Sequence, residues 1–226
     1  MPENLSSENL IITFYFFHFI FSLLAAEVRN LKWSTVAITI QSLFLACILA
    51  GVASIAANPS LYWWSLSTLI TKVVVIPYLL WRYIRNLPTA ETRPWLGTVP
   101  SMAVMLILVV MFYRFLHTNV DFMAPSMQAT AGPARSCLAL ALTIGVLGLW
   151  VLLVRRDAAK MVIGLVLLEN GVHLSLVTLA PALPETTVIG VTTNVIITVW
   201  LLLYLAGRIF RSLGTTDTAT LSELKY

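Results

Sequence analysis

The most constraining feature of the sequence is a series of apolar runs, each close to the length that crosses a lipid bilayer. About twenty residues of helix match the hydrocarbon thickness, and lipid admits only helices and closed barrels. The runs lack the alternation of barrel strands. The sequence therefore predicts an all-α, polytopic membrane bundle of about seven transmembrane helices, at about residues 9–26, 33–57, 60–85, 96–117, 133–154, 158–181 and 186–210.

Composition agrees with this fold class and narrows the function classes. Charged residues make up 11% of the 226 residues, whereas soluble domains carry roughly 25%. Cys47 and Cys137 lie far apart without a CxxC motif, so we expect neither a metal site nor a disulfide framework. The net charge of +4 gives no reason to expect nucleic acid as a partner. Glu3 and Glu8 stand where a signal peptide would be basic, so we expect the first run to be retained.

The basic residues are distributed unequally between the two ends of the predicted spans. One end receives only Arg114 and Arg135. The other receives Arg29, Lys32, Arg82, Arg85, Arg93, Arg155, Arg156, Lys160, Arg208, Arg211 and Lys225. The excess of basic residues on cytoplasmic loops predicts an N-terminus outside and a C-terminus in the cytoplasm.

We expect a single membrane domain over 1–226 that contains a faint internal repeat. The first three spans (1–95) and the last three (133–211) share a layout, and residues 96–132 supply a fourth helix and linker. Residues 212–226 would form a cytoplasmic tail. Both copies would run the same way, as a parallel repeat, although unrelated membrane helices also resemble one another.

Several polar residues fall near the middle of their spans. A charged group at that depth costs about 2.5–3.5 kcal/mol, so it faces the bundle interior or water and has partners. Lys72 lies in the third span, and Glu169 and His173 share one face of the sixth at i, i+4 spacing. We predict that these three transfer protons. Supporting polar positions are Asn170, Asn194, Gln41, His18 and Thr68.

The same residues also allow purely structural interpretations. Glu169 and Lys72 could form a buried ion pair, and His173 could be a satisfied core histidine. Asn194, Gln41 and His18 could simply bond neighbouring helices. Pro77 removes a backbone donor and would free the Val73 carbonyl beside Lys72. An aromatic group at one end of the third span predicts an interfacial belt; its members are Tyr62, Trp63 and Trp64.

Three stretches carry a resemblance to a known family: "SLSTLITKVVVIP" (65–77), "LLENGVHL" (167–174) and "GTTDTATLSELK" (214–225). The chain resembles component E of hydrogenase-4 over nearly its whole length. Its last three spans are similar to subunit K of NADH–quinone oxidoreductase and to the C subunit of Mrp antiporters. The subunit K family places its first acid near Val166 and a second near Asn194, so a two-acid relay is not intact in this chain.

The resemblance implies a non-redox subunit of a complex-I-like assembly in a bacterial or archaeal cytoplasmic membrane. Glu169 would be its essential acid and Lys72 a partner in a chain of buried charges. No catalytic centre and no cofactor are expected in this chain. The expected partners are antiporter-like and subunit-H-like membrane subunits and a peripheral redox arm of the nickel–iron hydrogenase type. The alternatives are a cation/proton antiporter subunit without a redox arm and a purely structural scaffold.

Overall fold

The computed structural model describes residues 2–56, 58–87, 97–124, 132–179 and 185–213, and within them it holds helices and no strand. The tail at 214–226, together with Arg93 and Lys225, lies outside the described residues. The elements are α1 (Pro2–Glu27), α2 (Leu31–Ala56), α3 (Pro59–Thr68), η1 (Leu69–Val75), α4 (Ile76–Ile84), α5 (Thr98–Thr118), α6 (Val120–Met123), α8 (Gly132–Val154), α9 (Ala158–Leu179) and α10 (Glu185–Leu213).

The described part of the chain contains seven helical segments long and apolar enough to cross a membrane, which confirms the predicted all-α bundle. Capping side chains explain where two of the helices begin. Asn58 caps α3 by accepting a hydrogen bond from the Ser60 N–H, with Pro59 at the first helical position. Asp157 accepts from the backbone N–H groups of Ala159 and Lys160 at the start of α9.

The third span is interrupted at its centre. Residues Leu69–Val75 form a π-helix, and the Ile76 N–H bonds back five residues to the Thr71 carbonyl. The α-helix resumes with Pro77 in its first turn, so the backbone irregularity predicted beside this proline takes the form of a widened turn. Lys72 lies inside that turn. Such π-segments are frequent at functional sites.

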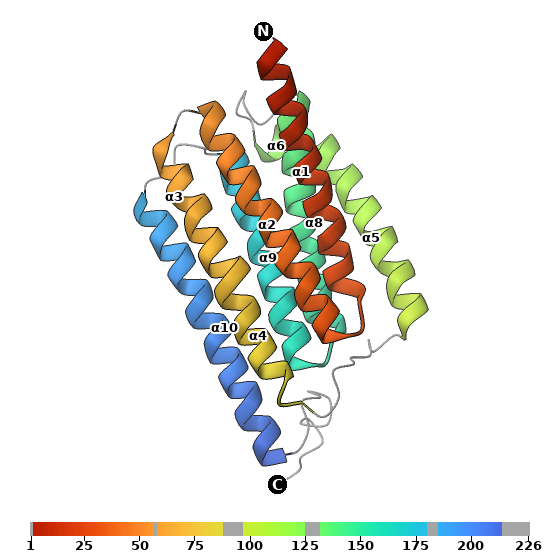
Figure 1. The fold of residues 1–226 in the computed structure, drawn as a ribbon. Helices are drawn as coiled ribbons and strands as arrows, with labels where there is room; N and C mark the ends of the chain where they lie inside the picture. Colours follow the sequence, from red (N-terminus) through yellow and green to blue (C-terminus); the bar gives the residue numbers. More distant parts are fainter. Residues whose placement is uncertain (1, 57, 88–96, 125–131, 180–184, 214–226) are drawn as a thin grey trace.

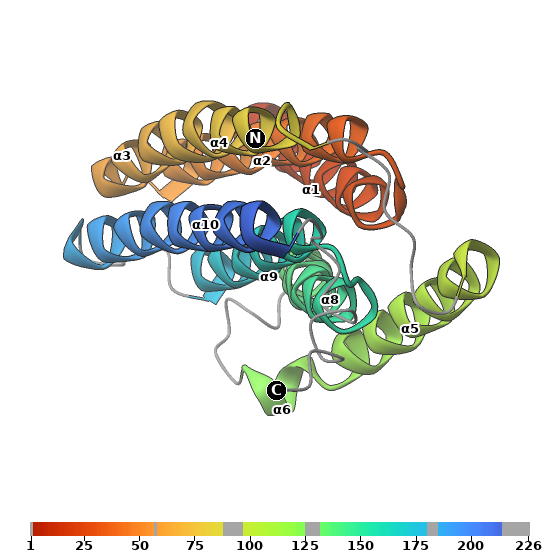
Figure 2. The same ribbon diagram turned by 90° about the horizontal axis from the view of Figure 1, so that it is seen from below.

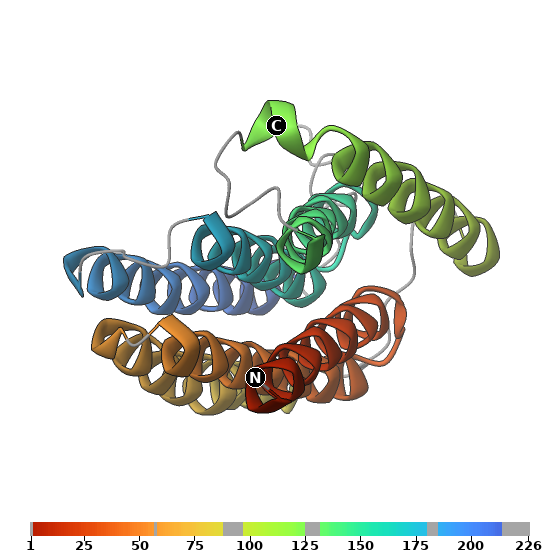
Figure 3. The ribbon, with the colours of Figure 1, turned by 90° about the horizontal axis from the view of Figure 1, so that it is seen from above.

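The helices pack in two layers (Figure 2). One layer holds α1, α2 and the third span, and the other holds α8, α9 and α10, with α5 packed against the outer side of α8. The view from the other end shows the same arrangement (Figure 3). Each layer thus contains one of the expected three-helix units; their origin by duplication stays a prediction. The start of α1 and the end of α10 lie at opposite ends of the bundle (Figure 1); which end faces the cytoplasm also stays a prediction.

Glycines bring α8 and α9 into close contact. A Cβ added at Gly148 would overlap the backbone nitrogen of Leu168, and one at Gly171 would come within 2.5 Å of the Gly145 nitrogen. Gly171 belongs to the "LLENGVHL" stretch. Small residues of this kind allow helix backbones to approach in membranes, and here they hold α9 at a fixed depth and rotation.

A second group of charges is buried at the turns that join α1 to α2 and α8 to α9. Lys160 is fully buried, and its Nζ donates to the carbonyls of Ala25 and Val28 at 2.7 Å each and to Ser34 Oγ at 2.8 Å. Arg155 Nη2 lies 2.8 Å from Glu27 Oε2. Burial lowers the pKa of the Arg155 guanidinium from its ordinary value, and the Glu27 carboxylate opposes that shift. The sequence predicts both basic residues at an aqueous end of the spans. In the structure they are buried, and their contacts join the two layers.

Candidate proton-transfer site

The Lys72 ammonium is the centre of a polar cluster between the two layers. Only 1% of the side chain is exposed. Its Nζ lies 2.6 Å from Asn170 Oδ1 and 2.9 Å from His173 Nδ1, and both partners belong to α9. The sequence placed these residues at similar depth, and the structure brings them into direct contact.

Glu169 completes the cluster on the side facing α10. Its Oε1 lies 3.5 Å from Lys72 Nζ and 3.2 Å from His173 Nε2. These separations fall within ion-pair reach, but neither Glu169 Oε1 nor His173 Nε2 is hydrogen-bonded within the described chain. The His173 ring thus lies between an amine at one nitrogen and a carboxylate at the other.

A hollow of about 490 Å³ adjoins this carboxylate. Glu169, His173 and Asn194 line it, together with apolar side chains of α9 and with Gly190 of α10. Glu169 is the most exposed member of the cluster, with 19% of its side chain accessible. Asn194, expected as a supporting position, therefore shares a space with the acid.

The other face of α9 continues the polar line into the first layer. Asn170 Nδ2 donates to Gln41 Oε1 at 2.6 Å. Gln41 Nε2 then lies 3.0 Å from His18 Nε2 and donates to Ser22 Oγ at 3.1 Å. A row of contacts therefore crosses the bundle from the hollow beside Glu169 to α1. Amides do not carry protons at ordinary pH, so Asn170 and Gln41 orient this row and do not relay along it.

The remaining supporting position lies close to the cluster. Thr68 is buried in the turn that precedes Lys72. Its hydroxyl belongs to the same helix face as the ammonium by i, i+4 spacing. The structure thus places Gln41, His18 and Asn170 in one connected row, and Thr68 and Asn194 beside it.

Sequence reasoning misplaced one residue of this site. Tyr62 and Trp63 are 49% and 64% exposed, as the interfacial belt requires, but Trp64 is only 1% exposed. Its ring packs edge-on against His173, with ring centroids 5.4 Å apart. Trp64, Thr68 and Lys72 are spaced four residues apart. This helical spacing indicates that Trp64 lies on the same buried face as Lys72.

Three titratable side chains thus meet within 3.5 Å in the middle of the bundle. A carboxylate, an imidazole and an amine are groups that take up and release protons. The described residues contain no group of three His, Cys, Asp or Glu side chains that could hold a metal ion. The arrangement suits proton transfer between side chains.

Comparison with known proteins places the chain in a family. It is 32% identical to "Hydrogenase-4 component E" of Escherichia coli strain K12 over 204 residues, which cover 90% of this chain and 92% of that protein. The same figures hold for the Shigella flexneri protein of that name. An uncharacterised protein of Mycobacterium tuberculosis is 25% identical over 71% of this chain and 70% of its own length.

The C-terminal part gives a second match. Residues 136–226 match the family of NADH-ubiquinone/plastoquinone oxidoreductase chain 4L. No solved structure matches the chain. Together with the seven apolar spans among the described residues, these relatives make the chain an integral protein of the cytoplasmic membrane. The chain belongs to the hydrogenase-4 component E family.

Proposed function

We propose that this complex-I-like membrane subunit moves protons through the cluster of Glu169, Lys72 and His173, coupled to electron transfer in another part of a multisubunit oxidoreductase. The observation that carries the proposal is the meeting of these three side chains within 3.5 Å beside a hollow. A lysine at the bilayer centre is costly, and one held among titratable partners is suited to exchange protons with them.

The proposed transfer has a direction within the cluster. The Lys72 ammonium donates to His173 Nδ1 at 2.9 Å, so the neutral ring carries its own proton on Nε2, which lies 3.2 Å from Glu169 Oε1. Lys72 passes a proton to Nδ1 while Nε2–H passes one to the Glu169 carboxylate, which releases it to the hollow. Rotation of the ring restores its first tautomer, and a proton from a neighbouring subunit recharges Lys72. Asn170 holds the amine in place while its charge changes.

The proposal extends to the surroundings of the subunit. Antiporter-like and subunit-H-like membrane subunits would continue the row of polar groups on either side, and a peripheral arm of the membrane-bound hydrogenase type would supply the electrons. The chain would contribute no redox centre. Its N-terminus would lie outside and its C-terminus in the cytoplasm, as the distribution of basic residues predicts.

The test compares Glu169→Gln and Lys72→Met in the assembled complex, reconstituted in sealed vesicles. Redox turnover and proton uptake into the vesicles are measured together, after checking that the subunits assemble. We expect proton movement per electron to fall by about a hundredfold, because each variant removes a proton-exchanging group. The matched control is Asp121→Asn, which removes an exposed carboxylate, paired with Arg135, at the end of a span; it should leave coupling unchanged.

The outcomes separate the three functions. Normal pumping in both variants would leave only a structural role for the buried charges and defeat the proposal. A complex that purifies without iron, nickel or flavin but exchanges cations for protons would identify an antiporter subunit. Loss of proton movement with continued redox turnover, confined to the two cluster variants, supports the proposal.

A further inference from the structure

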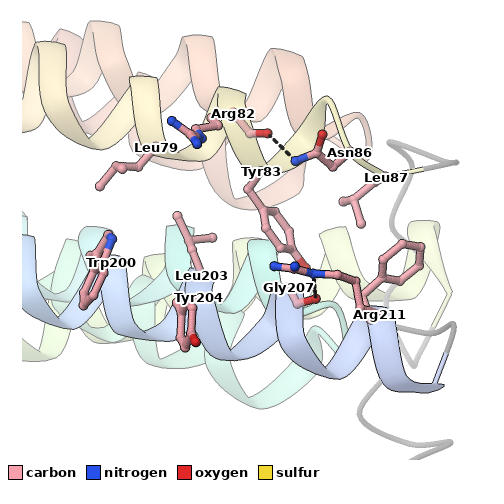
Figure 4. A pocket seen from close by; sticks show the side chains of 11 residues that line it. Leu79, Arg82, Tyr83, Asn86, Leu87, Trp200, Leu203, Tyr204, Gly207 and Arg211 are labelled. Atoms are coloured by element: carbon pink, nitrogen blue, oxygen red, sulfur yellow. Dashed lines mark hydrogen bonds between the residues drawn. The ribbon is translucent and has the colours of Figure 1, made fainter.

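A groove unrelated to the proton-transfer cluster runs between α4 and α10. It has a volume of about 640 Å³ and lies where the third and last spans end (Figure 4). The two helices that form it come from different layers and meet at one edge of the bundle (Figures 1 and 2). The groove combines two basic side chains with an apolar stretch along the helices.

Arg82 and Arg211 supply the positive charge of the groove; Arg82 lies beside Leu79 on α4, and the Arg211 side chain extends along α10 toward Tyr83 (Figure 4). Both side chains are exposed, and each belongs to the last turn of its helix. Neither takes part in an ion pair with another described residue, and no acidic residue is among the described residues that line the groove. The groove therefore carries two positive charges and attracts an anion.

A buried hydroxyl points to the same kind of ligand. Tyr83 extends from α4 toward α10 and is only 9% exposed (Figure 4). Its Oη is buried without a hydrogen-bond partner among the described residues. An unpaired buried hydroxyl costs free energy, and a phosphate oxygen in the groove would accept a hydrogen bond from it.

Toward the middle of the span the lining becomes apolar and aromatic. Leu79 lies on α4, and Trp200 and Leu203 lie on α10 (Figure 4). Trp200 stacks on Tyr204 with ring centroids 5.9 Å apart, and both rings are about half exposed. From Arg211 to Trp200 the helix rises by about 16 Å, close to the hydrocarbon depth of one leaflet.

We propose that this groove binds one anionic phospholipid. Arg82, Arg211 and the Tyr83 hydroxyl bind its phosphate, and an acyl chain lies along Leu79, Leu203 and Trp200. Basic pockets between transmembrane helices commonly bind such headgroups. A neighbouring transmembrane helix fits less well, because it would have to bring acidic groups to the membrane boundary, whereas an anionic lipid brings charge and chain in one molecule.

The test uses the full chain in nanodiscs of phosphatidylcholine that contain spin-labelled phosphatidylglycerol or spin-labelled phosphatidylcholine. The fraction of motionally restricted label gives the preference for the anionic lipid. We expect Arg82→Gln and Arg211→Gln each to lower this preference about fivefold. Tyr83→Phe should lower it about threefold. The lysine variants Arg82→Lys and Arg211→Lys should retain most of it, because they keep the charge.

Arg114→Gln is the matched control, since it removes the same charge from exposed α5, away from the groove. An equal loss in this control would show general charge attraction and overturn the proposal. Competition by inorganic phosphate would reveal an ion site without a lipid and would overturn it as well. In the intact complex, a Leu203→Cys variant that cross-links efficiently to another subunit would show a protein helix in the groove, with the same consequence.

Discussion

The ammonium of Lys72 determines the direction of the hydrogen bonds around it. An ammonium only donates, so Asn170 presents Oδ1 to it and turns Nδ2 toward Gln41. Gln41 then presents Oε1 and donates through Nε2 to His18 Nε2. His18 therefore carries its proton on Nδ1, which lies 2.8 Å from the Gln41 carbonyl. One charge thus orders polar side chains on three helices.

Asn170 is the residue on which this order depends, and its replacement tests it. Asn170→Leu keeps the branching of the side chain at Cγ but removes the acceptor of Lys72 and the donor to Gln41. We expect a loss of about 1–3 kcal/mol in stability, because buried polar groups are left unpaired. The measurement is the midpoint of thermal unfolding of the chain in mild detergent. Asn119→Leu at the end of α5, where the side-chain amide donates to the Phe115 carbonyl of its own helix, is the control; equal midpoints would refute the ordering role of Asn170.

At the scale of elements, the position of α9 is set by its contact with α8. The backbones approach at Gly148 and Gly171, where a methyl group has no room. The same helix carries Glu169, Asn170 and His173. A displacement of α9 therefore moves every member of the cluster relative to Lys72. The geometry of the proton-transfer cluster therefore depends on the close packing of α9 against α8.

Gly171→Ala tests this requirement. We expect the added methyl group to destabilise the chain by about 1–3 kcal/mol, because it forces two backbones apart. It should also weaken coupling in the assembled complex through displacement of Asn170 and His173. Gly207→Ala is the control, since the added atom would lie at an ordinary contact distance of 3.8 Å from Tyr83 Cε2, away from the cluster, and alanine favours the helix. A Gly171→Ala chain as stable as wild type would show that the contact can relax.

At the scale of the whole molecule, buried charges join the two layers. Lys72 in the first layer has its described partners on α9 in the second. Lys160 and Arg155 of the second layer bind carbonyls and a carboxylate at the end of α1. Each layer alone would expose a charge to lipid. The layers are therefore expected to be stable only together.

Division of the chain between residues 95 and 96 tests this dependence. We expect residues 1–95 and 96–226 to accumulate in the membrane when produced together and to be degraded when produced singly. The first piece alone must hold Lys72 in lipid at a cost of about 2.5–3.5 kcal/mol. Lys72→Met should therefore raise the level of the single piece, measured by immunoblot of membranes. Lys32→Met, at an exposed position, should not; if it rescues equally, the buried charge is not the cause.

Much of this architecture and site was determined by the sequence alone, because lipid imposes a simple rule. An apolar run of twenty residues must be a helix there, and a charge within it must find a partner. That rule predicts the seven spans. It also predicts that Lys72, Glu169 and His173 have partners inside the bundle. Spacing also places Glu169 and His173 on one face of α9, since the helical period fixes their relation within a single element.

Only the tertiary structure decided which polar residues meet. Asn170 lies around the helix from Glu169, and its contacts with Lys72 and Gln41 depend on the rotation of α9 between two layers. Trp64 and Lys160 are buried although their positions near span ends resemble those of exposed residues. The groove between α4 and α10 joins segments more than a hundred residues apart. Periodicity describes one helix at a time, whereas these contacts depend on how separate helices pack.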